Sequence, residues 1–186
     1  MLGSLIEQES CLSLTHSKCW NPKSRLKTSR EEGAGFGQLT RAWRPDGSLR
    51  FDAVAELRNK YPQQLWELNW SNIYDRPDLQ MRGLILKSKE NYDYYRKSSD
   101  EYNALVFGDA AYNGGIGGLD RERAACGMSP TCDKNKWFGN VERFCLKSTG
   151  PLYGTRSACD INREHPYNVF LVRANKYRLY FNNQPK

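Results

Sequence analysis

Residues 98–115 read SSDEYNALVFGDAAYNGG, a stretch that is typical of a helix with defined ends. Ser98 followed by Glu101 forms the Ser-x-x-Glu pattern of a capping box, so we expect a helix over 99–112. The two glycines after Asn113 are expected to end this helix, because glycine adopts the backbone conformation of a helix C-terminus without strain. The chain is therefore helical at its centre.

Helical patterns also flank this stretch on both sides, and Pro77 and Pro166 stand where proline is tolerated, in a first turn. We expect further helices over residues 2–12, 52–61, 63–74, 77–97, 118–126 and from Pro166 onward. Residues 13–32 lack periodicity and are expected to form a loop, and at most a minor hairpin is expected near 33–50. The sequence predicts a mainly α fold.

The 186 residues fit one domain, 1–186, with ordinary hydrophobic and charged fractions of 39% and 26%. No apolar run approaches the roughly 20 residues that span a bilayer. Residues 1–6 lack a basic region and a long apolar region, so we expect no ordinary signal peptide there.

The chain is basic, with a formal net charge of +7 and a pI of about 9.1. Such a surface suits a polyanion, which includes nucleic acid, anionic lipid and a bacterial cell wall. The Lys and Arg residues are spread along the chain and no nucleic-acid-binding motif is present, so we expect no nucleic-acid partner.

The six cysteines fall into three local pairs: Cys11 with Cys19, Cys126 with Cys132, and Cys145 with Cys159. An even number in close pairs favours disulfides and an oxidising compartment, although other connectivities stay open. No Cys-x-x-Cys motif is present and the two histidines are His16 and His165, so we expect no metal site. Residues 127–160 hold much of the remaining Gly and Pro and are expected to form an irregular, cross-linked lobe near the C-terminus.

Three short segments stand out for their chemistry. Glu7-Gln8-Glu9-Ser10 ends the first predicted helix, Gly35-Phe36-Gly37-Gln38 is a glycine-rich turn, and Ala110 to Gly115 ends a later helix. In this order they resemble the signatures Glu-Ser, Gly-Leu-Met-Gln and Ala-Tyr-Asn-(Ala/Gly)-Gly of soluble lytic transglycosylases and goose-type lysozymes. The resemblance covers about residues 2–118, is greatest to bacteriophage endolysins of this group, and implies a lysozyme-like fold.

Glu9 is the residue that the resemblance makes the catalytic acid. Cleavage of a glycosidic bond needs a proton on the leaving oxygen, and a poorly solvated carboxyl at the end of an apolar helix keeps its proton near neutral pH. Glu7 lies two residues earlier and points to a different face of the helix, so we expect it to be solvated.

The matching family positions imply that Ser10, Phe36, Gln38, Tyr112 and Asn113 bind substrate or hold Glu9. Each has a local alternative: capping for Ser10 and Asn113, turn packing for Gln38, and a core position for Tyr112. Phe36 and the following glycine replace the Leu-Met of the family, which alters the wall of that sugar subsite.

The product of the reaction depends on whether a second carboxylate takes part. Lytic transglycosylases use a single Glu together with the N-acetyl group of the substrate and form a 1,6-anhydromuramoyl product without water. Glu31 or Glu32 could instead position a water molecule, which would give hydrolysis as in a lysozyme. A non-catalytic cell-wall-binding module with the same fold is a further alternative.

The resemblance implies peptidoglycan as the partner and no cofactor. It also implies a monomeric endolysin, made in the host cytoplasm, that acts on the cell wall in the host periplasm. Delivery that depends on a holin is compatible with this interpretation.

Overall fold

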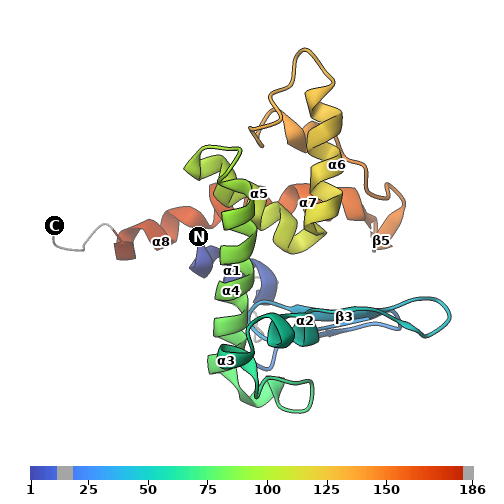
Figure 1. The fold of residues 1–186 in the computed structure, drawn as a ribbon, viewed down its shortest axis with the longest axis vertical. Helices are drawn as coiled ribbons and strands as arrows, with labels where there is room; N and C mark the ends of the chain where they lie inside the picture. Colours follow the sequence, from blue (N-terminus) through green and yellow to red (C-terminus); the bar gives the residue numbers. More distant parts are fainter. Residues whose placement is uncertain (12–18, 182–186) are drawn as a thin grey trace. The chain divides into compact units, whose positions relative to one another are not determined.

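The computed structural model describes residues 1–11 and 19–181, and the side chains at the C-terminal end up to Tyr177 (Figure 1). The chain divides into two compact units, 1–87 and 88–186, and each is described by itself. None of the helices in the described ranges is long and apolar enough to cross a membrane.

The first unit contains an antiparallel four-stranded sheet in the order β1-β2-β3-β4. Its elements are α1 (Leu2–Ser10), β1 (Arg25–Lys27), β2 (Glu31–Ala34), β3 (Leu39–Trp43), β4 (Leu49–Asp52), α2 (Ala53–Lys60), α3 (Pro62–Leu65), the 3-10 turn η1 (Ile73–Asp75) and the first part of α4 (Pro77–Tyr95). Helix α2 packs against β3 (Figure 1). The core is formed by buried residues Ala34, Leu39, Val54, Leu57, Leu65, Leu68, Ile73 and Leu79.

The sheet is the main departure from the sequence-based prediction. Strand β1 and the start of β2 lie within 13–32, where a loop was expected, and the hairpin expected near 33–50 is part of a larger sheet. Residues 12–18 lie outside the described residues. These strands are short, and the apolar residues Leu26, Leu49 and Phe51 are exposed, so apolar and polar residues do not alternate with a clear period of 2.

Helix 63–74 was also predicted wrongly, whereas 52–61 and 77–97 were confirmed within two residues. The α-helix in this region covers only Pro62–Leu65. Asn69 and Asn72 form turns after it through their side chains. Asparagine competes for backbone hydrogen bonds in this way and disfavours a continuous helix.

The turn between β2 and β3 is held by the buried carboxamide of Gln80 on α4. Its Oε1 accepts a hydrogen bond from the Phe36 backbone N–H at 3.0 Å, and its Nε2 donates to the carbonyls of Pro22, at 2.9 Å, and Ile73. Gly35 has a φ of +71°, and a Cβ there would lie 2.1 Å from Gln80 Oε1. The turn therefore requires glycine for its backbone conformation and for its contact with Gln80.

The second unit is helical apart from a two-stranded ribbon. Its elements after α4 are α5 (Glu101–Gly114), α6 (Ile116–Gly127), the 3-10 turn η2 (Val141–Arg143), β5 (Pro151–Tyr153), β6 (Arg156–Ser157), α7 (Ala158–Tyr167), the π-helical turn η3 (Asn168–Val172) and α8 (Ala174–Phe181). Helices α5 and α7 lie side by side (Figure 1). The core includes Tyr95, Val106, Phe107, Leu119, Trp137 and Val141.

Two predicted helix starts in this unit are corrected. The N-cap of α5 is Asp100, whose side chain accepts from the Asn103 backbone N–H, and not Ser98. Pro166 lies near the end of α7 and does not open a helix; the capping box of α7 is made by Ser157 and Asp160. In the first case a competing cap residue two positions away takes the role, and in the second the helix begins well before Pro166, after Ser157.

All three predicted disulfides are present: Cys11–Cys19, Cys126–Cys132 and Cys145–Cys159. The last two cross-link the predicted irregular lobe at 127–160, which contains only the short elements η2, β5 and β6 and the first turn of α7. The chain is thus mainly α, with a small sheet and a cross-linked C-terminal region.

Gly35→Ala tests the contact between the β2–β3 turn and Gln80, with Gly47→Ala as the matched control. Both glycines have positive φ, so each alanine costs about 1–2 kcal/mol of backbone strain. Nothing lies within 4 Å of a Cβ at Gly47, whereas at Gly35 the buried Gln80 must move and lose hydrogen bonds. We expect the free energy of unfolding, measured in urea, to fall about 2 kcal/mol further in Gly35→Ala. Equal losses would contradict this role of Gln80.

Candidate functional site

Glu9 lies in the last turn of α1. Leu5 and Ile6, which precede it by four and three residues, are 1% and 3% exposed, whereas Glu9 itself is partly exposed. The apolar residues anchor this face of the helix, and Glu9 follows them at the next turn. Glu7, expected to be solvated, is 1% exposed, so that prediction was wrong.

Ser10 fixes the end of α1. Its hydroxyl donates to the Ile6 carbonyl at 2.6 Å and accepts from the Trp20 backbone N–H at 3.1 Å. The neighbouring Cys11–Cys19 disulfide joins the end of α1 to the residue before Trp20. These contacts give Ser10 the capping role, and they set the direction in which the chain leaves Glu9.

Gln38 completes the turn that begins at Gly35. It has a φ of +43°, and its Nε2 donates to the Gly35 carbonyl at 3.0 Å and to Ser24 Oγ at 3.3 Å. Its Oε1 lies over Gly33, where a Cβ would come within 2.7 Å. The amide nitrogen is therefore used by the turn, while Phe36 beside it is partly exposed.

Glu32 is fully engaged in an ion cluster, as the hydrogen bonds to its carboxylate show. Oε1 accepts from Arg25 Nε at 2.8 Å and from the Tyr74 hydroxyl at 3.2 Å, and Oε2 accepts from Arg41 Nη2 at 2.8 Å. Burial by itself would raise the pKa of Glu32, but the hydrogen bonds from Arg41, Arg25 and Tyr74 together lower it. Burial, followed by the charge of Glu32, raises the pKa of Tyr74 to about 12.

The cluster continues through Arg41 to the start of α2. The guanidinium of Arg41 lies 4.3 Å from the ring centroid of Trp70 and 5.2 Å from that of Trp43. Trp70 Nε1 donates at 2.9 Å to the carboxylate of Asp52, which caps α2. Glu32 therefore stabilises the sheet and the segment around Trp70, and it has little capacity left for a substrate.

Glu31 has a different environment from its neighbour. Adjacent residues of a strand point to opposite faces, so Glu31 does not share the cluster of Glu32. It is partly exposed, and burial raises its pKa, with Arg30 and Arg50 opposing the shift. Of the two predicted second carboxylates, Glu32 is the one that forms ion pairs with two arginines, Arg25 and Arg41.

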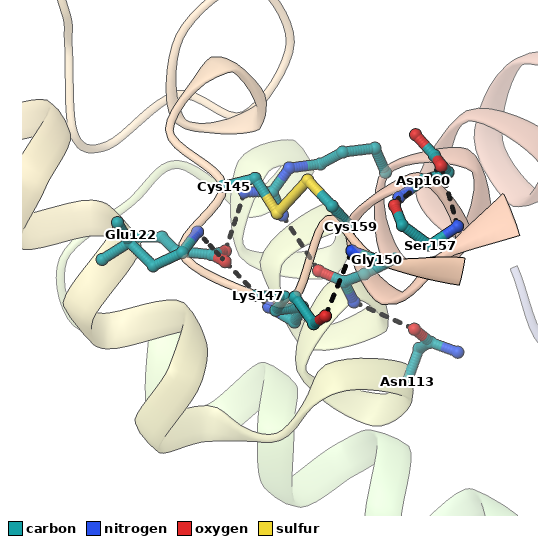
Figure 2. The surroundings of a disulfide bond; sticks show 12 residues. Asn113, Glu122, Cys145, Lys147, Gly150, Ser157, Cys159 and Asp160 are labelled. Carbon is teal, nitrogen blue, oxygen red and sulfur yellow. Dashed lines mark hydrogen bonds and ion pairs between the residues drawn. A yellow bond between two sulfur atoms is a disulfide. The ribbon is translucent and has the colours of Figure 1, made fainter. Parts of the chain in front are cut away.

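Tyr112 and Asn113 belong to the last turn of α5 in the second unit. Tyr112 is 7% exposed, as expected for a core position, and Asn113 is exposed. The Oδ1 of Asn113 accepts from Asn162 Nδ2 of α7 at 3.0 Å (Figure 2). The glycine at the end of the helix, Gly115, has a φ of +80°, which confirms the predicted helix end.

The helix pair α5–α7 contains a second buried polar contact. His165 Nδ1 and Asp109 Oδ2 are 2.8 Å apart, and both side chains are nearly inaccessible. In the described residues no group of His, Cys, Asp and Glu is arranged to hold a metal ion.

Sequence reasoning missed two residues that shape these segments: Gln80 and Asn162. Gln80 and Asn162 lie 44 and 49 residues from their partners in the two motifs. A polar residue on the buried face of a helix was the signal that could have found them.

Comparison of the chain with protein-family models, with curated proteins and with solved structures gave no match.

Replacing Glu31 and Glu32 separately by Gln should change stability in opposite directions. The lowered pKa of Glu32 means that its ionised form stabilises the fold above the unfolded pKa of about 4.3, and this contribution is lost as the pH falls through the folded value. At pH 7 we expect Glu32→Gln to lose about 2 kcal/mol, a difference that shrinks below about pH 4.

The raised pKa of Glu31 has the opposite effect on stability. Burial disfavours its ionised form, so the charge of Glu31 destabilises the fold at neutral pH. We expect Glu31→Gln to unfold at a slightly higher urea concentration than the wild type at pH 7. A loss in Glu31→Gln equal to that of Glu32→Gln would refute the division of roles between the two carboxylates.

Proposed function

We propose that the chain is a lysozyme-like peptidoglycan lytic transglycosylase of the endolysin type, with Glu9 as its catalytic acid. The observation that carries the proposal is the presence of three motifs in the order of the family. They are Glu9-Ser10, Gly35 to Gln38, and Ala110 to Gly115. In support, each motif ends a helix or forms a tight turn. Such positions present side chains at the edge of an element, where a substrate can reach them.

In the proposed reaction, Glu9 donates its proton to the oxygen between N-acetylmuramic acid and N-acetylglucosamine, and the β-1,4 bond breaks. The carbonyl of the substrate's N-acetyl group stabilises the positive charge at C1. The Glu9 carboxylate then removes the proton of the muramoyl 6-hydroxyl, whose oxygen forms the new bond to C1. Glu9 regains its proton, no water is consumed, and the product carries a 1,6-anhydro ring.

The state of the second carboxylates supports this single-acid chemistry. Glu32 is committed to Arg25, Arg41 and Tyr74 and is poorly placed to activate water. Glu31 keeps a partly exposed carboxyl, so hydrolysis with Glu31 as the base is the second candidate.

The disulfides and the charge support the proposed place of action. Three disulfides suit the oxidising periplasm, and a net charge of +7 favours approach to an anionic cell wall. Peptidoglycan strands are the proposed partner.

Glu9→Gln tests the proposal, since glutamine has a similar shape but cannot donate the proton. We expect muropeptide release from purified sacculi to fall by about a thousandfold, with an unchanged melting temperature. Wild-type rates in this variant would reject Glu9 as the acid, and binding of sacculi without any release by the wild-type chain would indicate a wall-binding module.

Glu31→Gln serves as the matched control and shows whether the reaction is transglycosylation or hydrolysis. Mass spectrometry separates the anhydro product, which is one water molecule lighter, from the hydrolysed one. We expect anhydro products from the wild type and from Glu31→Gln at similar rates. Hydrolysed products from the wild type, lost in Glu31→Gln, would assign the chain to the lysozymes.

A further inference from the structure

Asn162 of α7 joins the helix end that carries Asn113 to the rest of the second unit. Its Nδ2 donates to two acceptors of α5, the Ala110 carbonyl and Asn113 Oδ1, both at 3.0 Å. Asn162 is 1% exposed, whereas Asn113 is exposed. A buried amide thus sets the rotamer of an exposed one.

The orientation of the Asn162 amide is fixed from its other side. Arg163 Nη1 donates to Asn162 Oδ1 at 2.9 Å, and because arginine has no acceptor, only the oxygen can face it. The Nδ2 group must then face the Ala110 carbonyl and Asn113 Oδ1. The Nδ2 group of Asn113, in turn, points away from this contact (Figure 2) and is presented as a hydrogen-bond donor.

Arg163 is itself held by a buried charge. Glu122 is 0% exposed; its Oε2 lies 2.9 Å from Arg163 Nη2, and its Oε1 accepts from Lys147 Nζ at 2.9 Å (Figure 2). Burial lowers the pKa of Lys147, which Glu122 opposes. The ion cluster ties α7 to α6 and to the segment after Cys145.

The backbone next to Asn113 packs closely against Asn162 and Lys147. A Cβ at Gly114 would lie 2.6 Å from Asn162 Nδ2 and 2.7 Å from Lys147 Cε. The Cys145–Cys159 disulfide anchors the first turn of α7, three residues before Asn162 (Figure 2). Asn162 therefore has a fixed position against the end of α5.

We propose that Asn162 is a positioning residue for substrate binding: it holds Asn113 so that the Asn113 Nδ2 donates to an oxygen of the glycan. This inference rests on the proposed function, in which Asn113 contacts the sugar. Asn162 acts through Asn113 and does not touch the glycan itself.

The test compares Asn162→Ala with Asn91→Ala, a matched control in the same unit. Asn91 is also buried, and its Nδ2 also donates to an α5 carbonyl, that of Gly108, at 3.1 Å. Asn91 lies against the middle of α5, so its loss affects packing without freeing Asn113. Muropeptide release from sacculi gives kcat and KM, and thermal unfolding gives the stability of each variant.

We expect both alanine variants to melt at lower temperature but only Asn162→Ala to lose kcat/KM, by about tenfold. Asn113→Ala and the double variant Asn113→Ala/Asn162→Ala should show the same loss as Asn162→Ala, because residues that act as one unit are not additive. If Asn162→Ala fails to fold, Asn162→Asp, which keeps the acceptor for Arg163, takes its place.

Equal activity losses in Asn162→Ala and Asn91→Ala, or losses that multiply in the double variant, would overturn the role of Asn162 and leave the proposed function intact. A wild-type chain that releases no muropeptides would overturn the proposed function and this inference together.

Discussion

The first unit depends on one buried carboxamide, that of Gln80. It joins three segments that are distant in sequence, namely the turn at Phe36, the segment at Pro22 and the turn η1 at Ile73. A buried amide that loses a partner is costly, so each of these segments is held in place by the other two. The glycine-rich turn, which carries Gln38, is therefore a rigid element, and α4 is its support.

The acidic residues of the first unit differ in their burial. Glu32 is buried and bonded to two arginines and a tyrosine, whereas Glu9 and Glu31 are partly exposed residues. In the second unit the buried charge of Glu122 has the structural role, as Lys147 and Arg163 surround it. Buried charges thus support the sheet of the first unit and the helices of the second.

The sequence predicted those features that local patterns specify. Helix α4, the end of α5 and the three disulfides follow from proline, glycine and cysteine spacing. The four-stranded sheet was missed because its strands are short, expose apolar residues such as Leu49 and Phe51, and are stabilised by cross-strand contacts such as that of Glu32 with Arg41. Similarly, Glu7 was expected in solvent and is buried, because two-residue spacing on a helix does not decide which face packs.

The most direct measurement is a crystal structure of the Glu9→Gln variant with a bound peptidoglycan fragment that contains the bond to be cleaved. We expect the oxygen of that bond to lie about 3 Å from the side chain at residue 9, with Gln38 in contact with a neighbouring sugar. A glycan bound elsewhere on the chain, with the side chain at residue 9 in contact with water alone, would contradict it.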